Sequence, residues 1–191
     1  YLQGAADEWH DRAASALTAQ IIKSGFFQQL RTDQQLGYVV SAFDWPQLQV
    51  PGLVMLIQSP VADADKVSGA MRTFLESVPA ALDEEQFARH QAALISDILR
   101  PDQNLWERAE FYWQSIANKQ YGFDGRQQLA QAVESFTLAS WQDYFQQVYI
   151  ERPHSLQVVA PGRWKRLPKG DFQRFDGAAD IKRDHQTYLG D

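Results

Sequence analysis

The chain has 191 residues, 45% of them hydrophobic, and its 24 acidic residues against 18 basic ones leave a formal net charge of -6. This length is enough for one well-packed domain and short for two. The negative charge argues against a general nucleic-acid or anionic-membrane partner, and no apolar run approaches the length that crosses a bilayer. Cysteine is absent, so disulfides and thiolate metal sites are excluded.

The first residues resemble the end of a strand. Tyr1-Leu2-Gln3 opens the chain without a methionine and without a basic, apolar signal segment. We therefore expect the chain to be a piece of a longer polypeptide.

A long helix is expected from Asp7 to Leu30, because apolar residues recur there at helical spacing. Its buried stripe consists of Trp9, Ala13, Leu17 and Ile21, widened by Ala16, Ala19 and Ile22. Strands rich in β-branched and aromatic residues are predicted at about 36–43 and 48–58. Since only a short turn joins them, they are expected to be antiparallel.

Helices are expected to fill most of the chain from residue 65 to residue 149. The expected bounds are about Asp65 to Val78, Asp83 to Leu99, Asn104 to Ile116, Gly125 to Val133 and Thr137 to Tyr149. Asp83 and Gln86 predict a capping box at the start of the second helix. A last strand is predicted at 156–159.

This order of elements predicts an α+β fold with an antiparallel sheet, since strands and helices do not alternate strictly. The stretch from residue 161 to 191 is rich in charge, glycine and aspartate, and it is expected to form a partly disordered surface tail. Trp164, Phe172 and Phe175 are the residues that could pin it to the domain. Four tryptophans, Trp45, Trp106, Trp113 and Trp141, are interpreted as core or domain-interface residues.

Function is expected where the first helix meets the first long strand. Phe27, Arg31 and Tyr38 are placed to gather at this junction. An arginine offers a fixed fork of donors to a carbonyl or carboxylate, and a tyrosine hydroxyl donates a hydrogen bond to a developing oxyanion. The structural interpretation of the same residues is that the arginine complements the helix dipole and that the tyrosine packs.

The pattern Phe-x-x-Leu-Arg-Thr-x-x-Gln-Leu-Gly-Tyr-x-Val, from Phe27 to Val40, resembles the signature in the C-terminal half of pitrilysin- and insulysin-type zinc metallopeptidases. The resemblance continues more loosely to about Ala160. It implies that residues 1–160 form a C-terminal domain of this insulinase family, the half without zinc, in which helices pack on one side of the sheet. Residues 161–191 would then follow as the surface tail.

The resemblance also implies a closed chamber built from two halves, of which the first holds the zinc and the second helps to hold the peptide. Residue by residue, Arg31 and Tyr38 match the pair that hydrogen-bonds the substrate near the scissile carbonyl. Phe27 matches an apolar wall of the same pocket. The implied partners are a peptide substrate and the N-terminal, zinc-bearing half of the same polypeptide.

The chain itself lacks the family's zinc-binding pattern, a His-x-x-Glu-His helix. Its histidines, His10, His90, His154 and His185, lie far apart in the sequence. Because a zinc site needs imidazoles and a carboxylate at set spacing, we expect no cofactor in this chain and zinc in another domain of the parent protein. His10 and His90 are interpreted as residues of solvated helix faces.

Two functions from different classes compete. The first is the last domain of a zinc metalloendopeptidase, inactive alone, with a periplasmic location favoured by the resemblance to bacterial pitrilysins. The alternative is a non-catalytic scaffold or peptide-binding subunit of the same fold. Arg31 and Tyr38 together favour the first, since a scaffold has no need of the pair. An unrelated α+β peptide-binding domain would require the motif match to be accidental.

Overall fold

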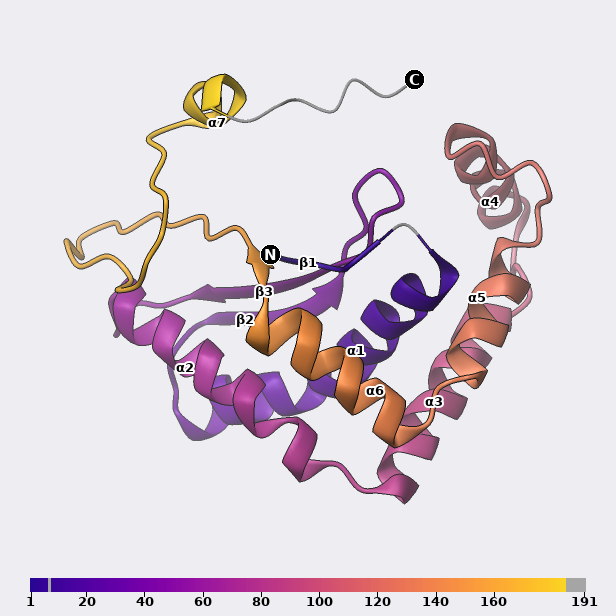
Figure 1. Ribbon diagram of the computed structural model, residues 1–191, viewed down its shortest axis with the longest axis horizontal. Coiled ribbons are helices and arrows are strands. Elements are labelled where there is room, and N and C mark those ends of the chain that lie inside the picture. Colours follow the sequence, from indigo (N-terminus) through magenta and orange to yellow (C-terminus); the bar gives the residue numbers. More distant parts are fainter. Residues whose placement is uncertain (7, 185–191) are drawn as a thin grey trace.

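An antiparallel sheet with helices on one of its faces forms the fold in the computed structural model, which describes residues 1–6 and 8–184 (Figure 1). Its strands are β1 (Leu2–Gln3), β2 (Val39–Asp44), β3 (Gly52–Gln58) and β4 (His154–Ser155). Their order in the sheet is β2-β3-β1-β4, and every neighbouring pair is antiparallel. The predicted α+β class with an antiparallel sheet is confirmed.

The helices follow the predicted order. They are α1 (Trp9–Phe27), α2 (Ala64–Ser77), α3 (Glu84–Leu99), α4 (Leu105–Ala117), α5 (Gly125–Glu134), α6 (Leu138–Phe145) and α7 (Ala178–Asp184). The capping box at the start of α3 is present, because the side chains of Asp83 and Gln86 each accept from the other residue's backbone amide. No helix in the described part of the chain is both long enough and apolar enough to span a membrane.

The core forms where α1 packs against β2, α3, α5 and α6. Small residues such as Ala13 and Ala14 are fully buried on α1, and so are Leu17, Phe26 and Leu30 along the same chain segment. On the sheet, Val40 and Ala42 of β2 point toward the helices because side chains alternate between the two faces of a strand. The predicted helical stripe therefore does lie against the sheet.

Trp141 joins α6 to α1 in the centre of the core. Its side chain is completely buried, and its Nε1–H donates a hydrogen bond of 3.0 Å to Oγ1 of Thr18. The core interpretation is thus confirmed for Trp141. It fails for Trp45, Trp106 and Trp113, whose side chains are 54%, 76% and 66% exposed. The domain-interface alternative stays a prediction for these three residues.

The strand predicted at 156–159 is wrong, because the last strand is His154–Ser155. β1 pairs with β4 only through Leu2 and Gln3, and Tyr1 exchanges two further hydrogen bonds with Leu156. Beyond Leu156 there is no strand among the described residues for the chain to pair with. Strand-like residues alone do not make a strand without a partner.

The last segment lies against the loop and first turn that join β3 to α2. The amide of Lys169 donates to Oδ1 of Asp65 at 3.0 Å, and Nε of Arg166 lies 3.4 Å from the other oxygen of the same carboxylate. Trp164, Phe172 and Phe175 are half-buried. The division at residue 160 stays a prediction, and the end of the predicted tail, 185–191, lies outside the described residues.

A carboxyl group is buried between the sheet and α1. Asp44 lies on the helix-facing side of β2, where it accepts a hydrogen bond of 2.6 Å from the hydroxyl of Ser15. Burial raises the pKa of the Asp44 carboxyl, and the hydrogen bond from Ser15 partly offsets this shift. Because the folded protein then holds the proton to a higher pH than the unfolded chain, the native state binds more protons within that window.

We therefore expect the free energy of unfolding to fall as the pH rises from about 4, near the pKa of an unfolded aspartate, through the raised pKa of Asp44. Asp44→Asn, which keeps an acceptor for Ser15, should remove this part of the fall. Its free energy of unfolding should therefore increase relative to that of the wild type as the pH rises. Urea denaturation across this pH range measures the difference. Asp176→Asn, at an exposed aspartate, is the control, and equal pH profiles for wild type and Asp44→Asn would contradict the expectation.

Candidate functional site

The structure brings Phe27, Arg31 and Tyr38 together in one cluster. The guanidinium carbon of Arg31 lies 5.3 Å from the ring centre of Phe27 and 5.5 Å from that of Tyr38. Its Nη1 also donates a hydrogen bond to the backbone carbonyl of Tyr38. Cation–π contacts on both sides and this hydrogen bond hold the arginine head group in one place. We call these three residues the Arg31 cluster.

The end of α1 positions Arg31. The helix continues into a π-helical turn, Gln28–Asp33, which is closed when the amide of Leu36 donates to the carbonyl of Leu30 at 2.9 Å. Leu30 and Leu36 are both buried in the core, so they anchor the turn on both sides of Arg31. Single π-helical turns of this kind are frequent at functional sites. The sequence predicted the helix here and not its change of winding.

Gly37 brings the chain close enough to β3 to start the next strand. A Cβ atom at this position would lie 2.7 Å from the carbonyl oxygen of Gln58 and 2.9 Å from Cγ2 of Ile57. Both contacts are closer than real Cβ atoms make, so only glycine fits without a shift of β3. The amide of Tyr38 then donates to the carbonyl of Gln58 at 3.0 Å, which fixes Tyr38 at the edge of the sheet.

The Arg31 cluster faces solvent. The side chains of Tyr38 and Phe27 are 75% and 44% exposed, and the Tyr38 hydroxyl has no hydrogen-bond partner among the described residues. A guanidinium group has five N–H donors, and the contact with the Tyr38 carbonyl uses one nitrogen of Arg31. The cluster therefore presents a phenol and a guanidinium donor to a carbonyl or carboxylate oxygen from outside.

Metal-binding groups do not gather in this part of the chain. No group of three or more His, Asp or Glu residues is arranged to hold a metal ion within residues 1–6 and 8–184. His10 is exposed, as interpreted, and stacks on Phe136 at 4.6 Å. His90 is half-buried rather than solvated, and burial lowers its pKa. His185 lies outside the described residues.

A second feature is a stripe of exposed apolar side chains along α4, which lies away from the sheet (Figure 1). Leu105 is 83% exposed, and Trp106 and Trp113 are nearly as open. Ile116 and Tyr121 extend the exposed surface. We call these five residues the α4 stripe. Exposed large apolar side chains that gather on one helix make this surface a candidate for contact with another domain.

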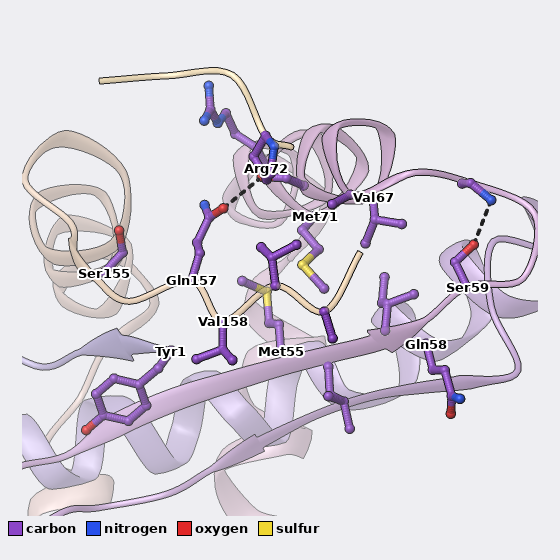
Figure 2. A pocket seen from close by; sticks show the side chains of 18 of the residues that line it. Tyr1, Met55, Gln58, Ser59, Val67, Met71, Arg72, Ser155, Gln157 and Val158 are labelled. Carbon is purple, nitrogen blue, oxygen red and sulfur yellow. Dashed lines mark hydrogen bonds between the residues drawn. The ribbon is translucent and has the colours of Figure 1, made fainter. Parts of the chain in front are cut away.

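A hollow lies between β3, α2 and the chain that follows β4. Its volume is about 1110 Å³. Figure 2 shows Met55 of β3 facing Val67 and Met71 of α2 across it, with Val158 on the side of the last segment. We call this hollow the β3 groove. The sequence analysis did not predict this hollow.

The chain is similar to known peptidases. A family model described as PQQ synthase PqqF-like, C-terminal lobe domain 4, matches residues 17–113, just over half of the chain. Protease 3 of Escherichia coli K12 is 29% identical over 174 residues, which are 90% of this chain and 18% of that protein. Insulin-degrading enzyme-like 2 of Arabidopsis thaliana is 27% identical over 168 residues, 85% of this chain and 17% of that protein.

The fold has a counterpart in a solved structure. A crystal structure of pitrilysin matches 80% of this chain with a TM-score of 0.72 and 28% sequence identity. The match takes in 17% of the pitrilysin chain. The chain thus spans less than a fifth of the length of these relatives, and the segment matched by the family model contains the whole Arg31 cluster.

The close approach at Gly37 predicts a large cost for any side chain there. Gly37→Ala should destabilise the domain by about 1–3 kcal/mol and shift the Tyr38 amide signal, because β3 must move to admit the methyl group. Gly69→Ala is the matched control, since nothing lies within 4 Å of a Cβ built on Gly69 inside α2. This second variant should stabilise the protein by about 0.5–1 kcal/mol. Thermal unfolding of both variants is the measurement, and a Gly37→Ala protein as stable as wild type would contradict the tight approach.

Proposed function

Because the chain belongs to the PqqF-like C-terminal lobe domain 4 family of insulinase-type metallopeptidases, we propose that it is the substrate-binding end of a zinc metalloendopeptidase. In this proposal the chain supplies groups that hold the peptide and stabilise the transition state. The zinc ion and the base that activates water belong to the other half of the enzyme. The chain alone is then inactive, and the resemblance to bacterial pitrilysins favours a periplasmic location for the whole enzyme.

The Arg31 cluster is the observation that carries the proposal. Peptide-bond hydrolysis places negative charge on the carbonyl oxygen of the scissile bond, and donors aimed at that oxygen lower the barrier. Arg31 and Tyr38 offer two such donors from a junction anchored by Leu30 and Gly37. A fixed pair costs no reorganisation when the charge develops, which is the condition for strong electrostatic catalysis.

The proposal divides the labour between two halves. Within residues 1–6 and 8–184, no group of His, Asp or Glu residues is arranged to hold a metal ion, and the proposed zinc ligands belong to the other half. Phe27, 44% exposed beside Arg31, offers an apolar wall to a substrate side chain. The N-terminal, zinc-bearing half of the same polypeptide is the proposed partner, and a peptide is the proposed substrate.

A scaffold is the second candidate, and the α4 stripe is the surface that it would use. Leu105, Trp106 and Trp113 are large apolar side chains that are all strongly exposed. Isolated domains rarely expose several such side chains together. A domain of a larger enzyme also needs such a surface to meet its neighbours, so the stripe is compatible with both candidates. The exposed Tyr38 hydroxyl distinguishes them, because a scaffold gains nothing from a solvent-facing donor pair.

Substitutions in the complete enzyme test the role of the donor pair. Arg31→Ala and Tyr38→Phe should each lower kcat about 10²- to 10³-fold, the usual loss when one transition-state donor is removed. Binding of the peptide should change less than turnover, and Phe27→Ala should act mainly on KM because it removes an apolar contact. Steady-state cleavage of a short fluorogenic peptide measures all three.

Arg89→Ala is the matched control, because Arg89 is also a surface arginine, and its partner Glu85 lies one turn earlier on the same face of α3. Its kcat should equal that of the wild type. Since Arg31 also supports the carbonyl of Tyr38, thermal unfolding of each variant must show an intact fold. Unchanged turnover in folded Arg31→Ala and Tyr38→Phe enzymes would remove the pair from catalysis and leave the scaffold.

The metal belongs to the other half in this proposal, so the two parts should respond differently to chelation. The complete native protein should contain about one zinc per molecule and lose peptidase activity with a chelator. The 191-residue chain should bind no zinc in equilibrium dialysis, and its thermal midpoint should not change with chelator. Stoichiometric zinc on the isolated chain would contradict the division of labour.

A further inference from the structure

The edge of β3 that faces away from β2 is paired only at its beginning. β1 pairs with Gly52 and Leu53, whereas β2 pairs with β3 from Leu53 to Gln58. Within the described residues, Val54–Gln58 therefore has a strand on one side only. An open strand edge presents N–H and C=O groups that bind another strand.

The hydrogen-bond pattern shows which groups face the open side. In an antiparallel ladder, residue pairs that exchange hydrogen bonds alternate with pairs that do not. The amide of Trp45 donates to the carbonyl of Gly52 at 2.7 Å, so the alternation leaves the Met55 and Ile57 pairs without bonds to β2. The amide and carbonyl groups of Met55 and Ile57 consequently point away from β2, into the β3 groove.

The opposite wall of the groove is the chain that follows β4. The amide of Leu156 donates to the carbonyl of Tyr1 at 2.9 Å, and the amino group of Tyr1 donates to the carbonyl of Leu156 at 3.0 Å. Because β1 lies between β3 and β4 in the sheet, the space beyond Tyr1 is flanked by Val54–Gln58 on one side and 157–160 on the other. A strand that continued β1 past Tyr1 would enter this space, because β1 lies next to β3 in the sheet.

We propose that the β3 groove binds one further strand of the longer polypeptide, which continues β1 beyond Tyr1 and runs antiparallel to β3. The inference rests on the proposed function, in which the chain is one domain of a larger enzyme. The pairing of Leu2 with Leu53 sets the register. Counted back from Tyr1, the first residue of the strand lies opposite Met55, and the third lies opposite Ile57.

The side chains around the groove define the chemistry of the strand. Met55 and Ile57 share a face with Ala42 and Val40, their partners on β2, and that face points to the helices. Val67, Met71 and Leu75 of α2 line the groove on this side (Figure 2). The first and third residues of the strand must therefore be apolar. The second lies on the other face, beside Leu56, which is 48% exposed, and can be polar.

Short N-terminal extensions of the 191-residue protein test the proposal. One version carries Thr-Val-Thr-Val directly before Tyr1, which puts valine opposite Met55 and Ile57. The matched control carries Val-Thr-Val-Thr, which has the same composition and places the valines on the other face. In the first version, hydrogen exchange of the Met55 and Ile57 amides should slow by about tenfold or more, and the thermal midpoint should rise by a few degrees. The control should show neither change.

Equal exchange in the two extended versions and the unextended protein would overturn the proposal. The same tetrapeptide, acetylated and added free at equal concentration, is the second arm. Protection by the free peptide as strong as by the extension would assign the groove to peptides in trans instead. Protection that rises with the concentration of the unextended protein would assign it to a second copy. Hydrogen exchange does not depend on peptide cleavage, so the result stands apart from the turnover test of Arg31 and Tyr38.

Discussion

The packing of α1 against the sheet is the constraint on which the rest of the structure depends. The helix can approach so closely because its buried face alternates large side chains with alanines such as Ala13 and Ala14. Two polar residues on this face, Ser15 and Thr18, are buried at no loss of hydrogen bonds, since Asp44 and Trp141 are their partners. Farther along the chain, Phe26 and Leu30 are completely buried in the same core. These two residues hold the end of α1 and the turn that carries Arg31.

Local patterns in the sequence were enough to predict what depends on local physics. The helical stripe of α1, the capping box of α3 and the α+β class follow from spacing and from cap chemistry. The strand at 156–159 was wrong because a strand exists only with a partner, and the ladder beside β1 ends after Leu156. The exposure of Trp106 and Trp113 was also out of reach, since apolar spacing does not show whether the surface that it would cover is present.

The same distinction holds within the site. The motif located Phe27, Arg31 and Tyr38, and the expectation that helix and strand would bring them together is confirmed. The π-helical turn and the double stacking of the guanidinium could not be predicted, because they depend on Leu30 and Leu36 both reaching the core. In the proposed function, the chemistry of the cluster depends on groups from another part of the enzyme, so the roles of its residues are proposals.

The β3 groove and the Arg31 cluster share one strand. The carbonyl of Gln58 at the end of β3 accepts the amide of Tyr38, and the tight approach of Gly37 is made to Ile57 and Gln58. Ile57 is also one of the residues whose backbone groups face the open groove. A strand bound in the groove would hold β3 on both sides and reduce its local opening. The position of Tyr38 would then depend on the proposed strand, which lies on the far side of β3. The placement of the proposed donor pair would thus be linked to completion of the sheet.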